Sequence, residues 1–104
     1  MANPHRGEVD LKVDGQMYTM RLTLGAMAEL ETRLQTASIV GLAERFEAGE
    51  HSSDDLIALI TAGLRAGGRD VSEADVGSMT FEGGAVGATQ AAARLLATAF
   101  RGDS

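Results

Sequence analysis

Cysteine and tryptophan are absent from this chain of 104 residues, and proline occurs only once. Without thiols the chain can form neither a disulfide framework nor a thiolate metal site. Aromatic residues make up only 4% of the composition and apolar residues 44%, so the core has to be built from Leu, Val, Ile, Met and Ala. A chain of this length is expected to form a single domain, residues 1–104, with one hydrophobic core.

Positive charge is also scarce, since nine Lys and Arg residues face 15 Asp and Glu residues and the net charge is −6. Lys12 is the one lysine, so no basic patch is available to neutralise phosphates, which argues against nucleic-acid binding. No apolar run is long enough to span a bilayer. Pro4, His5 and Arg6 stand where a secretion signal would have its apolar segment. We therefore expect an intracellular protein that binds neither nucleic acid nor a membrane.

The segment at residues 8–23 alternates apolar and polar side chains with the period of two that is typical of half-buried strands. Asp14-Gly15 interrupts the alternation, and this pair favours the positive φ angles of a type I′ hairpin turn. With a two-residue turn, Leu11 faces Tyr18 and the apolar pairs share one side of the ribbon. The pattern predicts an antiparallel β-hairpin.

Four later segments with helical signals each follow a hydroxyl side chain that can cap a helix. The expected N-caps are Thr23, Ser38, Ser52 and Ser72. Ser52 and Ser72 have an aspartate three residues on, which is typical of a capping box. Gly49 and residues 67–68 are expected helix ends. The alanine-rich segment 85–101 has the highest helix propensity.

The helix after Thr23 has two further features. Glu29 and Arg33 lie four residues apart in the order that favours an ion pair. Gly25 in its first turn costs about 0.5–1 kcal/mol relative to alanine. We expect that glycine to mark either a close backbone contact or a later helix start.

These segments predict an α+β fold that is mainly helical, with an N-terminal β-hairpin packed on a cluster of about four helices. Residues 1–7 are expected to form a flexible arm, residues 8–23 the hairpin and residues 24–101 the helical region. A two-stranded hairpin exposes two edges, and helices are expected to cover its face but not both of these edges. Either the edges are protected by the charges of Glu8, Lys12 and Arg21, or another chain is received by strand addition or helix packing.

No group of residues predicts an enzyme or a cofactor site. His51 stands near Asp54 and Asp55, but two carboxylates in a first helical turn are explained by the helix dipole. The glycine pairs lack the flanking residues of a phosphate-binding loop, and no Gly-x-Ser-x-Gly elbow occurs. The C-terminal RGDS matches a cell-adhesion tetrapeptide, to which we assign no function on an acidic chain with no secretion signal.

Long stretches nevertheless resemble a known family. ANPHRGEVDLKVDGQMYTMRLTLGAMAELE, RFEAGE, DDLIALITAGLRAGG and EGGAVGATQAAARLLATAF are similar, in this order, to the small tail protein of alphaproteobacterial gene transfer agents. That family is classed with phage tail assembly chaperones and is also labelled tail tube protein. The resemblance implies a non-enzymatic protein of the bacterial cytoplasm that escorts the tape-measure protein while the tail tube polymerises. Its implied partners are the tape-measure and tail tube proteins, besides self-association.

The contact surface of such a chaperone is expected on the hairpin and first helix or on the last helix, although the same residues also suit a core. The candidate contact residues are Tyr18, Met20, Met27, Leu30, Leu95, Leu96 and Phe100. Methionine and leucine give an adaptable surface for an apolar client. The alternative function is a structural tube component that stays in the mature particle, although tube proteins build barrels from longer strands than this sequence predicts.

Overall fold

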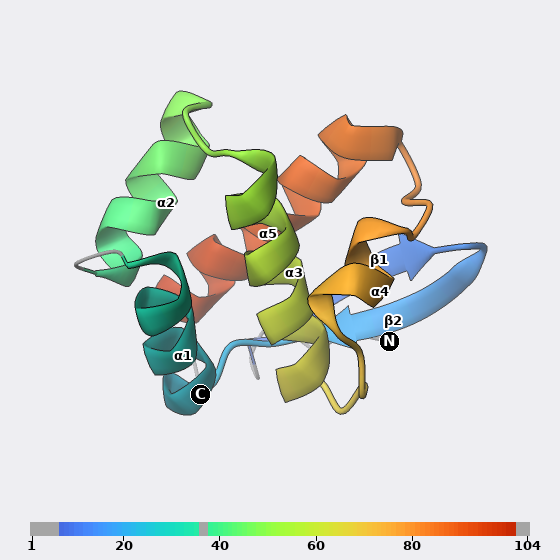
Figure 1. Cartoon of the computed structure of the whole chain (residues 1–104), viewed down its shortest axis with the longest axis horizontal. Helices are drawn as coiled ribbons and strands as arrows, with labels where there is room; N and C mark the ends of the chain where they lie inside the picture. The colour runs from blue at the N-terminus through green and yellow to red at the C-terminus, as the bar shows by residue number, and fades with distance from the viewer. Residues whose placement is uncertain (1–6, 36–37, 102–104) are drawn as a thin grey trace.

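The computed structural model describes residues 7–35 and 38–101. In these ranges an antiparallel pair of strands is followed by five helices, which confirms the mainly helical α+β fold (Figure 1). The elements are β1 (Val9–Val13), β2 (Gln16–Met20), α1 (Leu24–Leu34), α2 (Ile39–Ala48), α3 (Ser53–Ala66), α4 (Glu73–Gly77) and α5 (Gly84–Arg101). The arm expected at residues 1–7 lies outside the described residues except for Gly7, as does RGDS except for Arg101.

The hairpin has the predicted turn and register. Asp14 and Gly15 adopt φ angles of 51° and 80°, as a type I′ turn requires. Leu11 pairs with Tyr18 and Val9 with Met20, so these two pairs share one face. Met20 is fully buried on that face.

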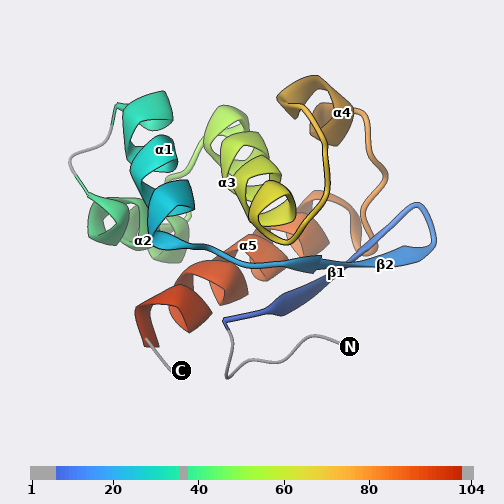
Figure 2. The same cartoon turned by 90° about the horizontal axis from the view of Figure 1, so that it is seen from below.

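Helix α3 lies at the centre of the molecule and contacts α1, α4, α5 and β2. Figure 2 shows α1, α3 and α4 along one side, with the hairpin and α5 beneath them and α2 at the end away from the hairpin. A Cβ at Gly63 would lie 2.7 Å from Leu95 Cδ2 and 3.2 Å from Met20 Cβ. The glycine therefore lets α3 pack closely on both side chains. The largest fully buried residues are Met20, Leu42, Leu59, Ile60, Leu64, Leu95, Leu96, Val13 and Val76.

The helix starts follow the predicted caps. Thr23 Oγ1 accepts the Ala26 N–H at 3.0 Å, and Ser38 Oγ accepts the Gly41 N–H at 3.1 Å. Ser52 and Ser72 each form a capping box with the aspartate three residues on. Because α1 begins at Leu24 and a Cβ at Gly25 would meet only Thr23 Oγ1, at 3.9 Å, neither explanation offered for Gly25 is correct.

In the second capping box, the Ser72 N–H donates to Asp75 Oδ2 and Ser72 Oγ accepts the Asp75 N–H. The backbone N–H of Ser72, followed by its side chain, lowers the pKa of Asp75 below its usual value. A carboxylate held in its charged form at a helix start stabilises the first turn. The five-residue helix α4 thus has a defined start, which fixes the position of its first residue, Glu73.

Both edges of the hairpin are partly occupied by other segments, of which only α3 is a helix. On the β1 edge, the Asp14 N–H donates to the Thr80 carbonyl and the Glu82 N–H to the Lys12 carbonyl, which flanks a bridge between Val13 and Phe81. These bonds use outward-facing groups of β1 that a strand from another chain would need.

The β2 edge is covered by α3. The Arg21 N–H donates to the Gly63 carbonyl at 3.1 Å, and the Thr19 carbonyl lies against Gly67, where a Cβ would collide with it. Because α3 and the segment after α4 occupy parts of both edges, strand addition is less favourable than the sequence suggested. Of the two ways of receiving another chain, packing of a helix is therefore favoured over strand addition.

Candidate functional site

Most of the candidate contact residues lie in the core. Met20, Leu95 and Leu96 are buried, because the hairpin face and the inner side of α5 are both covered by α3. Leu30 on α1 is also buried. Met20, Leu95 and Leu96 therefore offer no surface to a partner in this conformation. Periodicity in the sequence locates such residues on one face of an element but does not tell whether that face is covered.

The remaining candidates are partly accessible. Tyr18 and Met27 pack against the core at its margin, and Phe100 near the end of α5 is 44% exposed. The Arg69 guanidinium lies over the Tyr18 ring, 4.3 Å from its centroid, which is a cation–π contact. These three residues lie on three different elements, β2, α1 and α5, and each remains a proposed contact on its own element.

His51, Asp54 and Asp55 do not form a site. The His51 ring stacks on Phe46 with centroids 4.2 Å apart, which turns it toward α2. Asp55 caps α3 through Ser52 and lies 3.6 Å from Arg45 Nη1. Within residues 7–35 and 38–101, no three His, Asp or Glu side chains are grouped to hold a metal ion, and no helix is long and apolar enough to cross a membrane.

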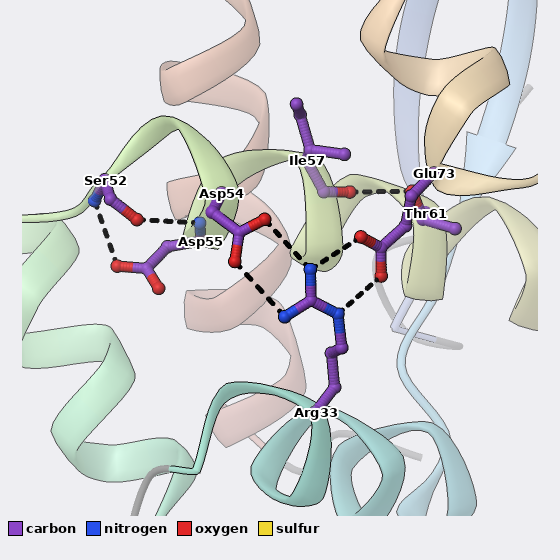
Figure 3. A network of polar contacts seen from close by, with 7 residues as sticks. All are labelled: Arg33, Ser52, Asp54, Asp55, Ile57, Thr61 and Glu73. Atoms are coloured by element: carbon purple, nitrogen blue, oxygen red, sulfur yellow. Dashed lines mark hydrogen bonds and ion pairs between the residues drawn. The ribbon is translucent and has the colours of Figure 1, made fainter.

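Arg33 joins three helices, as Figure 3 shows. Its Nε and Nη2 donate to the Glu73 carboxylate at 2.9 and 2.8 Å, and its Nη1 and Nη2 donate to the Asp54 carboxylate at 3.1 and 2.9 Å. Both contacts are bidentate, the strongest geometry for arginine with a carboxylate. The hydrogen bonds that Arg33 donates to Glu73, and then those to Asp54, raise the pKa of Arg33 above its usual value.

These partners correct the predicted pairing of Glu29 with Arg33. The guanidinium points away from α1 toward the starts of α3 and α4 (Figure 3). Glu29 makes no hydrogen bond or ion pair with any residue that the structure describes. The carboxylate of Glu29 is exposed and remains available for another charged group.

A surface groove of about 360 Å³ lies between α1 and α3, beside the Arg33 contacts. Apolar and small residues line it from both helices: Gly25, Ala26, Leu30, Ala58, Ala62 and Ala66. Polar residues at its margin are Thr23, Glu29, Thr61, Arg33, Arg65 and Glu73. Leu24, between two lining residues, is 84% exposed. An apolar floor with a charged margin is typical of surfaces that receive an amphipathic helix.

Sequence reasoning missed this groove, although α3 carried a signal. Ala58, Ala62 and Ala66 recur every four residues and thus lie on one stripe of the helix. A stripe of alanines leaves a hollow wherever the neighbouring helix does not fill it. The participation of Glu73 had no sequence signal, because it depends on how α4 packs against α3.

Comparison with known proteins gives a match over nearly the whole chain. The family model described as "Phage tail tube protein, GTA-gp10" matches residues 6–102. No curated protein and no solved structure gives a significant match.

Proposed function

Because the chain belongs to the family of phage tail tube protein GTA-gp10, we propose that it acts in tail assembly as a non-enzymatic chaperone that binds the tape-measure protein. It would work in the cytoplasm of the producing bacterium, while the tail tube protein polymerises around the escorted tape measure. The tape-measure and tail tube proteins are its proposed partners. The family is shown by the match over residues 6–102, and the chaperone role is our proposal.

The observation that carries this proposal is the groove between α1 and α3. A small helical domain with an apolar groove can cover part of a long helical client without enclosing it. Ala58 and Ala62 form part of the floor and Arg33 and Glu73 lie at the margin, so a client would meet apolar and charged atoms in one contact.

The acidic character of the chain supports the same role. A net charge of −6 on 104 residues makes copies of the protein repel one another in solution. Copies that coat a client side by side must remain soluble until they are displaced. Excess negative charge favours this behaviour.

A second candidate function is a structural component of the tail tube, and the description of the family favours it. Closed tubes are built from long strands whose edges pair between subunits. Here each strand has five residues, and parts of both hairpin edges are already occupied by Thr80–Glu82 and by α3. A tube role would need this conformation to change, and we therefore rank it second.

Co-expression with the tape-measure protein of the same particle tests the chaperone proposal. We expect the soluble fraction of the tape-measure protein to rise severalfold and the two proteins to co-purify, because apolar client surface is covered. An unrelated acidic protein of similar size serves as the control for a general effect of charge. Unchanged solubility without co-purification would show that the chain is not a chaperone for this client.

A further inference from the structure

The groove has the length and floor of a helix-binding site. Its lining along α1 runs from Gly25 to Arg33, which spans about 12 Å, or two helical turns. On the α3 side the lining includes three alanines together with Thr61 and Arg65. Small residues let the backbone of a second helix approach closely while its larger side chains fill the hollow.

The charges that line the groove are unequally paired. Glu29 and Glu73 are balanced in number by Arg33 and Arg65, but Arg33 is already paired with Glu73 and with Asp54. Arg65 on the other side uses its Nε to donate to the Val71 carbonyl at 2.6 Å. The margin along α1 therefore favours a basic group, and Glu29, which lacks a partner among the described residues, is the group it would meet.

We propose that this groove binds an amphipathic helix of the client, one that carries a stripe of small or aliphatic residues and a Lys or Arg beside that stripe. The inference rests on the proposed chaperone function and names the part of the chain that performs it. The basic residue of the client pairs with Glu29, and the apolar stripe packs on Ala58 and Ala62. The Arg33–Glu73 contact stays in place and closes one end of the site.

A charge-matched pair of variants tests the role of Glu29. Glu29→Lys and Glu44→Lys change the net charge equally, but Glu44 is exposed on α2 and outside the groove. We expect Glu29→Lys to weaken retention of the tape-measure protein about fivefold and Glu44→Lys to leave it nearly unchanged, since rim charges act locally. Equal retention by both variants would overturn the assignment of Glu29.

A groove-filling variant tests the floor. Ala62→Leu places a larger side chain in the hollow, and we expect about tenfold weaker retention, as for an interface centre. Thermal unfolding of Ala62→Leu shows whether this variant is folded. If it is not folded, retention by Glu29→Lys tests the groove instead. Full retention by both variants would overturn the groove assignment and leave the chaperone function standing. If the unaltered chain does not retain the tape-measure protein, both the groove assignment and the chaperone function are wrong.

A titration with defined peptides provides a readout that does not depend on the tape-measure protein. Two helical peptides share an alanine–leucine stripe and differ in carrying Lys or Glu beside it. We expect the Lys peptide to shift the amide resonances of α1 and α3 at severalfold lower concentration, and Glu29→Lys to reverse the preference. Shifts confined to other elements would overturn the proposal. So would shifts of the same amides with protein concentration alone, which would assign the groove to a second copy of the chain.

Discussion

Replacing Leu95 by alanine is expected to lower the free energy of unfolding by about 2–5 kcal/mol. Leu95 is fully buried, and its Cδ2 lies against the position of Gly63 on α3, next to Met20. Truncation removes apolar contacts and leaves a cavity that the close α3–α5 packing cannot readily fill. Since a domain of this size has about 5–15 kcal/mol of stability, the variant should fold but melt at a much lower temperature. Thermal and urea unfolding measure the change.

Leu24→Ala is the matched control, because the same atoms are removed from a residue that is 84% exposed. We expect a change within about 0.5 kcal/mol, as for most surface substitutions. The comparison also decides the role of Leu95 as a candidate contact residue. If Leu95→Ala kept its stability and lost the client instead, Leu95 would be a contact residue and the placement of α5 would be wrong.

Gly67→Ala is expected to destabilise the protein by about 1–3 kcal/mol, the usual effect of overpacking. The new Cβ would collide with the backbone carbonyl of Thr19 in β2. A backbone carbonyl cannot rotate away as a side chain can, so β2 and the end of α3 would have to separate. The φ angle of Gly67 is −81°, which alanine adopts without strain. A loss of stability would therefore come from the collision with the Thr19 carbonyl and not from the backbone conformation. Urea unfolding measures the change.

Gly25→Ala is the control with the opposite sign. A Cβ there would meet only Thr23 Oγ1, at 3.9 Å, and alanine in a helix is favoured over glycine by up to about 1 kcal/mol. We expect a small gain in stability. A gain or no change for Gly67→Ala would contradict the close approach of α3 to the hairpin edge.

The features predicted correctly from the sequence are local ones. The Asp14-Gly15 turn and the serine caps depend on residues within four positions of one another, and their geometry follows from short side chains and positive φ angles. The same reasoning located the helix end at Gly49, which has a φ angle of 71°. Such signals survive in almost any tertiary context.

The features that sequence reasoning missed depend on distant segments. Arg33 was expected to pair with Glu29 on its own helix, but Asp54 and Glu73 offer two bidentate contacts, which arginine favours over a single exposed pair. The return of Thr80–Glu82 to the β1 edge was also missed, because the sequence near β1 carries no signal for it. Only the packing of α3 and α4 decides these contacts.

The candidate contact residues show the same limit. Met20 and Leu96 were equally suited to a surface or to a core by type and spacing, and the structure buries both. The proposed groove lies between α1 and α3, where Leu30 lines it together with a stripe of alanines. A groove lined by small residues is recognised from the space that neighbouring helices leave, which requires the fold.

Quantitative mass spectrometry of purified particles and of the lysate of producing cells tests the chaperone function most directly. A chaperone leaves before the tail is complete, so the account predicts that the protein is abundant in the lysate and nearly absent from particles. An amount in particles close to that of the tube protein would contradict it and establish a structural tail component.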